Sequence, residues 1–153
     1  MTETQRLRVE DAMATRTVRI PQDANMYRAA EMVALSRVSD LMVVGEDDKF
    51  IGVLSEGDIL RAALPDMEEI VAEGGSLDTA FDIFLKKGRD LSKLSILPFV
   101  VTEPMVLGPD DHVAKAASAM IDLDIRVLPV IKDGKLVGSI SRADVCQAVV
   151  GSS

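Results

Sequence analysis

The sequence predicts an α/β protein built from two tandem β-α-β-β-α repeats that pack as a pseudo-twofold pair, with a helical insert between them. Three observations lead to this prediction. The chain repeats itself, each copy alternates short apolar runs with helical periodicity, and a single copy is too short to bury a stable core. With 153 residues, the chain has room for one compact body made from both copies.

The internal repeat is clearest near the end of each copy. Residues 49–59 match residues 135–145 at an offset of 86, with Lys, Gly, Ser and Asp at the same positions. Further upstream the offset grows to 88, where Pro21 matches Pro109. A drifting offset places single-residue insertions in loops. We therefore divide the chain into repeat 1 (7–64), a helical insert (65–93) and repeat 2 (94–150).

The same elements are predicted in each copy, in the same order. A short apolar strand at 17–20 or 105–107 is followed by a helix, because apolar residues recur at helical spacing over 26–34 and 113–121. The continuously apolar runs 41–44 and 128–131 are typical of buried strands. A polar turn then leads into a second hairpin strand, and Asp133-Gly134 is the stronger hairpin signal. That strand ends at Ser55 or Ser141, where a closing helix begins.

The insert contains one strongly marked amphipathic helix. The glycine pair at 74–75 breaks the chain, Ser76 is a suitable N-cap, and apolar residues recur at helical spacing over 77–85. Lysines at 86–87 supply a cationic last turn, and Gly88 is expected to be the C′ glycine that ends the helix. The helix either packs on the chain's own core or on a dimer partner, or it docks a client protein.

Composition restricts the classes of function. The 25 acidic and 17 basic residues give a formal charge of −8, which disfavours nucleic acid as a partner. A single cysteine, Cys146, excludes an internal disulfide framework, and a single histidine, His112, leaves little for metal or Ser-His chemistry. We expect Cys146 to be buried and His112 to lie at the surface near a helix start. No apolar run reaches membrane-spanning length and no signal peptide is visible, so a cytoplasmic protein is expected.

No pattern in the sequence points to catalysis. The chain shows no nucleophile–base pair, no P-loop, no dinucleotide-binding fingerprint and no metal-ligand spacing. We therefore expect a protein that is not an enzyme and that requires no cofactor and no metal.

The repeated motif resembles that of a known family. Residues 52–58 and 138–144 both look like the Gly-h-h-Ser/Thr-x-x-Asp motif of CBS domains, where h is apolar. Leu128-Pro129-Val130 is similar to the family's Leu-Pro-Val strand, and Asp11-Ala12-Met13 to its opening motif. The resemblance covers roughly 110 of the 153 residues. It implies a Bateman module, a tandem pair that binds AMP, ADP, ATP or S-adenosylmethionine in two clefts and often dimerises.

The resemblance also suggests which residues bind the ligand. A carboxylate can accept hydrogen bonds from both hydroxyls of a ribose, so Asp58 and Asp144 are expected to hold it, one in each cleft. Ser55 and Ser141, at helix starts, suit phosphate. The other candidates line the clefts or supply positive charge, and they are Thr17, Val18, Ile20, Val106, Leu107, Pro129, Arg126 and Arg142. Repeat 2 combines the serine, aspartate, proline strand and two arginines, so we favour it as the better site.

The Ser-x-x-Asp pattern has a structural interpretation as well, because it is also a capping box for the following helix. Two functions therefore stay open. One is a regulatory module, expected to be a homodimer, that senses an adenosine-containing ligand and passes this signal to a partner protein. The alternative is a ligand-free structural, dimerisation and partner-docking module.

Overall fold

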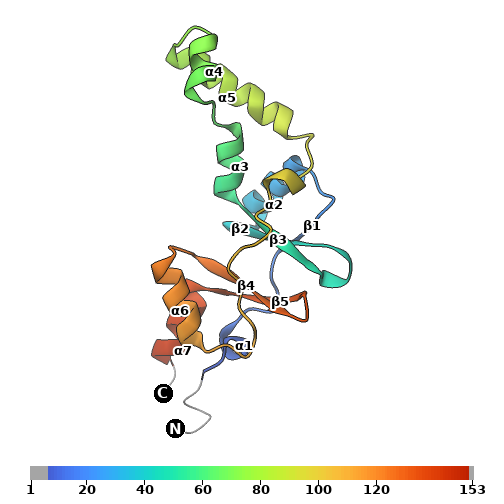
Figure 1. The fold of residues 1–153 in the computed structure, drawn as a ribbon, viewed down its shortest axis with the longest axis vertical. Helices are drawn as coiled ribbons and strands as arrows, with labels where there is room; N and C mark the ends of the chain where they lie inside the picture. The colour runs from blue at the N-terminus through green and yellow to red at the C-terminus, as the bar shows by residue number, and fades with distance from the viewer. Residues whose placement is uncertain (1–6, 152–153) are drawn as a thin grey trace. The chain divides into compact units, whose positions relative to one another are not determined.

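The computed structural model describes residues 7–151, which form two compact units (Figure 1). Of the described residues, unit 1 contains 7–19, 44–51 and 103–151, and unit 2 contains 20–43 and 52–102. The first six residues, on which the signal-peptide prediction partly rests, lie outside the described range. Among the described residues, no helix is both long enough and apolar enough to cross a membrane.

Unit 2 is built on a three-stranded sheet with α-helices around it. The strand order is β1 (Arg19–Pro21), β2 (Asp40–Val44), β3 (Phe50–Ser55), and the helices of the repeat are α2 (Met26–Ser36) and α3 (Glu56–Ala63). Helix α2 begins at Asn25, whose side chain accepts a hydrogen bond from the Arg28 N–H. The predicted helix, hairpin and closing helix of repeat 1 are confirmed, and its first strand begins two residues later than predicted. The short 3₁₀ turn η2 (Glu46–Asp48) occupies the loop between β2 and β3, and this loop belongs to unit 1.

Unit 1 is built on the antiparallel hairpin of β4 (Val127–Lys132) and β5 (Lys135–Ser141). Asp133 and Gly134 both have positive φ, 53° and 78°, as the tight hairpin turn requires, so the Asp-Gly prediction is confirmed. The helices of this unit are α1 (Val9–Ala12), α6 (Val113–Asp122) and α7 (Arg142–Gly151). Its core consists of Val9, Leu107, Val113, Ala116, Ala119, Met120, Leu128, Val130, Ile140 and Val145.

The two repeats exchange a segment, which the sequence analysis did not predict. Ala14, from repeat 1, pairs with Ser139 on β5 through backbone hydrogen bonds of 2.8 and 3.0 Å. Val101, at the start of repeat 2, pairs in the same way with Val53 on β3, at 3.0 and 2.9 Å. The compact units therefore do not follow the division of the chain into repeats 7–64 and 94–150.

A glycine lies under each exchanged segment. If Gly52 carried a Cβ, that atom would lie 2.3 Å from the Val101 carbonyl oxygen. At Gly138 the corresponding Cβ would lie 2.7 Å from the Ala14 carbonyl oxygen. Real side-chain carbons do not approach backbone atoms this closely, so the motif's glycine is needed here for backbone packing.

The predicted strand at 105–107 is wrong. Only Leu107 pairs, through its N–H to the Pro129 carbonyl at 3.0 Å and its carbonyl to the Ile131 N–H at 2.8 Å. Pro104 has no N–H for a ladder, and on the other side the Gly108 N–H donates to the Asp111 carboxylate in a turn. This segment therefore pairs with β4 at one residue only and does not form a strand.

The insert forms two helices, α4 (Met67–Ala72) and α5 (Leu77–Leu91), followed by the 3₁₀ turn η3 (Leu97–Phe99). Within unit 2, α5 packs on α3 and α4 (Figure 1). The Ser76 cap is confirmed, because its hydroxyl accepts from the Thr79 N–H at 3.0 Å. The prediction that Gly88 ends the helix is wrong. Helix α5 runs on to the buried Leu91, since its apolar face continues past Gly88.

Candidate functional site

The Ser-x-x-Asp motifs lie where β3 meets α3 and where β5 meets α7. In repeat 1, the Ser55 N–H donates to Asp58 Oδ2 at 3.1 Å and the Asp58 N–H donates to Ser55 Oγ at 3.0 Å. In repeat 2, the matching bonds of Ser141 and Asp144 are 2.9 and 3.1 Å long. Both motifs are therefore capping boxes, as the structural interpretation predicts. Each box uses Oδ2 of the carboxylate and leaves Oδ1 for another partner.

The carboxylates of Asp58 and Asp144 differ in the hydrogen-bond partner of their Oδ1 atom. Asp58 Oδ1 accepts a hydrogen bond from the Arg61 guanidinium at 2.6 Å. At the offset of 86, the position of Arg61 corresponds to Gln147. Within the described part of the chain, no cation pairs with Asp144. The carboxylate of repeat 2 therefore has an open oxygen at the start of a helix, whereas the carboxylate of repeat 1 is neutralised by its own helix.

The surroundings of Asp58 also shift its pKa. Burial alone would raise the pKa of Asp58, but the hydrogen bond from the Ser55 N–H and the bonds from Arg61 and the Ser55 hydroxyl outweigh it. The pKa of Asp58 is therefore held below its ordinary value. The charged form of this carboxylate is stabilised by the fold, which makes Asp58 a stabilising residue in the absence of any ligand.

This shift predicts how Asp58 affects stability in acid. A carboxyl group whose pKa is lowered by folding stabilises the protein above its unfolded pKa, about 3.9, and loses that contribution as the pH falls through the folded pKa. We expect Asp58→Asn to lower the free energy of unfolding at pH 7, and the difference from the wild type to shrink below about pH 4. Urea unfolding at pH 7 and pH 3 measures it. A difference that is the same at both pH values would contradict the assignment.

Several of the remaining candidates lie in unit 1 with Asp144. Thr17 Oγ1 is hydrogen-bonded to Ser139 Oγ at 2.8 Å, and Ser139 lies two residues before Ser141 on β5. Val18 follows Thr17 and is half-buried, while Val106 is partly exposed. The exchanged segment thus brings residues of repeat 1 beside the motif of repeat 2.

Three candidates are core residues. Ile20 lies in unit 2 and is completely buried. Leu107 and Pro129 are also buried, and they are joined by the single backbone rung described above. In this structure none of the three offers a side chain to a ligand.

The two candidate cations have different roles. Arg142 donates to the carbonyl oxygens of Met120 at 3.0 Å and Ile125 at 2.9 Å, and it pairs with Asp124 at 3.1 Å. Its guanidinium therefore caps the C-terminal end of α6. Arg126 is exposed, and its carbonyl accepts from the Arg142 N–H at 3.1 Å, so it lies beside the start of α7. Of the two arginines, Arg126 is the one available to an anion.

The sequence analysis missed Arg19. Its Nη1 donates to the Thr17 carbonyl at 3.0 Å and its Nη2 to the Leu136 carbonyl at 3.4 Å, while Nε is paired electrostatically with Asp48 at 3.2 Å. The side chain thereby ties the segment that carries Thr17 to β5. The sequence feature that could have indicated its role is its position, since it is an arginine within an otherwise apolar predicted strand.

The single histidine and the single cysteine are both on helices of unit 1. His112 caps α6, since its Nδ1 accepts from the Ala114 N–H at 2.9 Å, and the predicted surface position near a helix start is confirmed. The prediction that Cys146 is buried is wrong, because this thiol is exposed. Val145 turns toward the core, and the next residue on a helix points about 100° away from it.

Two copies of one hairpin unit, each closing on a helix-capping Ser-x-x-Asp motif and each covered by a segment of the other, define a tandem-repeat α/β module. The sequence model of the CBS domain matches residues 9–65 and 98–151, most of the chain. The protein therefore belongs to the CBS domain family, with two CBS repeats in tandem.

Known proteins of the same kind support this assignment. An uncharacterised protein of Methanocaldococcus jannaschii is 25% identical over 140 residues, which cover 84% of this chain and 83% of the relative. The mitochondrial CBS domain-containing protein CBSX3 of Arabidopsis thaliana is 30% identical over 133 residues. That match covers 84% of this chain and only 54% of CBSX3, about half of the plant protein.

Solved structures share the fold. The crystal structure of the CBS-pair protein CBSX2 from Arabidopsis thaliana superposes with a TM-score of 0.76 and 22% identity, covering 95% of each chain. A second structure, of CBSX2 in complex with AMP, gives a TM-score of 0.71 at 23% identity, covering 95% of this chain and 97% of that one.

Proposed function

We propose that the protein is a regulatory module that binds an adenosine-containing ligand at repeat 2 and passes this signal to a partner protein. The observation that carries the proposal is the open Oδ1 of Asp144 in the first turn of α7. The backbone N–H groups at the start of a helix suit an anion such as phosphate. CBSX2, which shares the fold, has been crystallised with AMP. The candidate ligands are AMP, ADP, ATP and S-adenosylmethionine.

Each part of the ligand has a chemical counterpart in unit 1. Asp144 accepts hydrogen bonds from the ribose hydroxyls through Oδ1, a charged interaction worth about 1.5–3 kcal/mol. Ser141 and the exposed Arg126 face the phosphate. Thr17 and Val18, on the exchanged segment, provide a wall for the base. A ligand held in this way contacts repeat 1 and repeat 2 at once, and it stabilises the backbone pairing of Ala14 with Ser139.

A homodimer is part of this proposal. Large apolar side chains are exposed on α5 and on α7, among them Phe81, Leu85, Val149 and Val150. A second copy of the chain and a client protein are the two partners proposed to cover them. The ligand-free alternative uses the same surfaces but leaves the Ser-x-x-Asp motifs as helix caps alone.

The test is calorimetric titration of the protein with the four ligands, after mass spectrometry has checked for ligand retained through purification. Asp144→Asn keeps an oxygen that accepts from the Ser141 N–H but removes the charge, and we expect it to weaken binding at least tenfold. Asp58→Asn is the matched control and should leave the affinity within about twofold. Equal affinity of Asp144→Asn and wild type would contradict the site. Absence of binding by all four ligands to empty protein would favour the ligand-free module.

A further inference from the structure

Arg19 contacts three stretches of unit 1 that are far apart in the sequence. Its Nη1 donates to the Thr17 carbonyl at 3.0 Å, its Nη2 donates to the Leu136 carbonyl on β5 at 3.4 Å, and its Nε lies 3.2 Å from Asp48 Oδ1. Asp48 belongs to η2, in the loop between β2 and β3. One guanidinium therefore connects this loop of repeat 1, the exchanged segment and the hairpin of repeat 2.

The Arg19 guanidinium depends on the charge of Asp48. Only 27% of the Arg19 side chain is exposed, and its Nε atom is buried. Among the described residues, Nε makes no hydrogen bond of good geometry, so the nearby carboxylate compensates it only through its charge. A buried donor that loses its compensation costs free energy. Without the negative charge of Asp48, we therefore expect the guanidinium to leave the two carbonyl oxygens and turn toward water.

The loop between β2 and β3 is itself attached to repeat 2. The Phe50 N–H donates to the Gly134 carbonyl, in the turn between β4 and β5, at 2.9 Å. Asp47 and Asp48 have positive φ, 53° and 60°, a conformation that aspartate tolerates better than most residues. The backbone at Asp48 thus directs its carboxylate to Arg19 from a loop whose other end is fixed on the hairpin. The positions of the loop and of the guanidinium are therefore linked.

Arg19 acts on the proposed ligand site through the residues that precede it. Thr17 and Val18 are the proposed wall for the base, and the guanidinium holds the Thr17 carbonyl and ties it to Leu136. The other side-chain contact of this segment with β5 is the hydrogen bond from Thr17 to Ser139, at 2.8 Å. A wall that is ordered before the ligand arrives spares the ligand the entropy cost of ordering it, whereas a released segment must be ordered on binding.

We propose that Arg19 is a positioning residue for the ligand site of unit 1, and that Asp48 makes the loop between β2 and β3 a regulator of that site. This inference rests on the proposed function and adds a regulation to it. Coupling between two sites is reciprocal. A displacement of the loop therefore lowers the affinity for the ligand, and the bound ligand in turn stabilises the loop.

Calorimetric titration of the full chain with AMP compares two neighbouring carboxylates. Asp48→Asn removes the charge that faces Arg19 and is expected to weaken binding about fivefold. Asp47→Asn is the matched control, because Asp47 is exposed, also has positive φ, and forms no ion pair among residues 7–151. Asparagine adopts positive φ as readily as aspartate, so neither variant strains the loop. The affinity of Asp47→Asn, and that of the charge-retaining Asp48→Glu, should stay within about twofold of the wild type.

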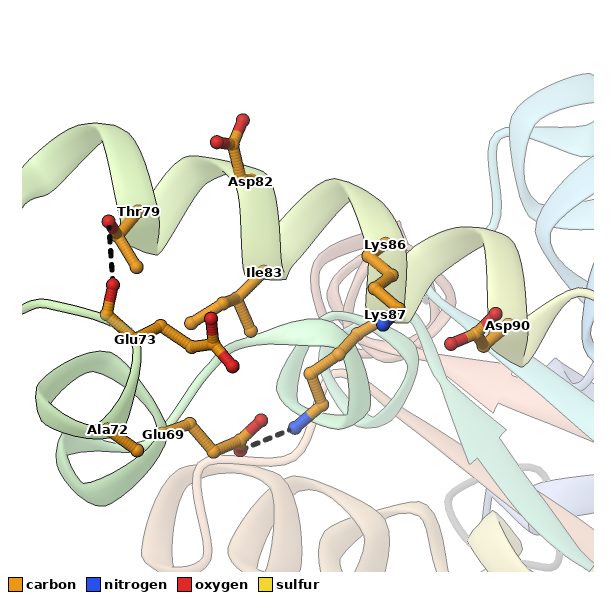
Figure 2. Close-up of a pocket in the computed structure, with 9 residues that line it drawn as sticks. All are labelled: Glu69, Ala72, Glu73, Thr79, Asp82, Ile83, Lys86, Lys87 and Asp90. Atoms are coloured by element: carbon orange, nitrogen blue, oxygen red, sulfur yellow. Dashed lines mark hydrogen bonds and ion pairs between the residues drawn. The ribbon is translucent and has the colours of Figure 1, made fainter.

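A double-mutant cycle separates positioning from general destabilisation. Arg19→Met is expected to weaken AMP binding at least tenfold, and Asp48→Asn to have no further effect in that background, because the carboxylate acts through the guanidinium. The control is an ion pair of unit 2, in which Lys87 crosses the hollow between α4 and α5 to Glu69 at 2.8 Å (Figure 2). Glu69→Gln should lower the melting temperature and leave the AMP affinity within about twofold.

Hydrogen exchange of the full chain measures the same coupling from the loop. AMP is expected to slow exchange of the Lys49 and Phe50 amides in the wild type and to have little effect on them in Asp48→Asn. If the wild type binds AMP and Asp48→Asn binds it equally well, with the same exchange at the loop, the regulation is overturned while the proposed function stands. If the wild-type chain, free of retained ligand, binds none of the four candidate ligands, both are overturned.

Discussion

Replacing Gly52 by alanine is expected to destabilise the protein by about 3 kcal/mol or more, the range of a severe overpacking substitution. The added methyl group would lie 2.3 Å from the Val101 carbonyl oxygen and 2.7 Å from a methyl carbon of Val100. The close atom is backbone, which cannot rotate away as a flexible side chain can. The segment at Val101 must therefore leave β3, and the two backbone hydrogen bonds with Val53 are lost with it.

Urea unfolding followed by circular dichroism measures the effect, and two other glycines provide the controls. Gly138→Ala should be destabilising by a smaller amount, since one of its close contacts is the flexible Met13 side chain. Gly88→Ala adds the same atom into open space within a helix and should stabilise the monomer by roughly 0.5–1 kcal/mol. If all three substitutions changed stability alike, the exchanged segments would not be the reason for the motif's glycines.

Replacing Gln147 by arginine is expected to weaken nucleotide binding about tenfold or more, which corresponds to the loss of one charged hydrogen bond. Gln147 occupies the position in α7 that Arg61 occupies in α3. An arginine there lies one helical turn beyond Asp144 and can take its Oδ1, as Arg61 takes Oδ1 of Asp58 at 2.6 Å. The ligand must then displace an intramolecular ion pair before it can bind the carboxylate.

The converse change completes the test. Arg61→Gln frees the carboxylate of repeat 1, so a second, weaker binding event is expected to appear in calorimetric titrations. Gln147→Lys, in which a flexible ammonium replaces the planar guanidinium, should weaken binding less than Gln147→Arg. If Gln147→Arg bound the ligand as tightly as the wild type, the open oxygen of Asp144 would not be what selects repeat 2.

The features that could be predicted from the sequence are those determined by neighbouring residues. Asp133-Gly134 fixes its turn by its own backbone preference, and Ser76 caps α5 through the residues that follow it. The Ser-x-x-Asp boxes are local in the same sense, because all of their hydrogen bonds lie within four residues. For these elements, periodicity and capping rules are sufficient.

The features that were missed depend on packing between distant parts of the chain. Neither the segment at Ala14 nor the segment at Val101 contains a sequence pattern that predicts its partner strand. Cys146 is exposed because α7 packs on the core of unit 1 through a different face, the one that carries Val145. A glycine after two lysines is typical of a helix end, but α5 continues past Gly88 because Leu91 is buried against its unit. The ion pair of Arg61 with Asp58 could have been predicted from the sequence, since an arginine three residues after an aspartate on a helix lies on the same face.

The exchange of segments also fixes an order of events during synthesis. Ala14 leaves the ribosome about 125 residues before its strand partner Ser139. Until Ser139 has been made, the segment at 7–19 has no strand of unit 1 to join, and their pairing closes a loop of about 125 residues. Val101 meets Val53 much sooner, so unit 2 can assemble on the nascent chain. Unit 1, which holds the proposed ligand site, is therefore expected to become complete later than unit 2, once β5 and α7 have been made.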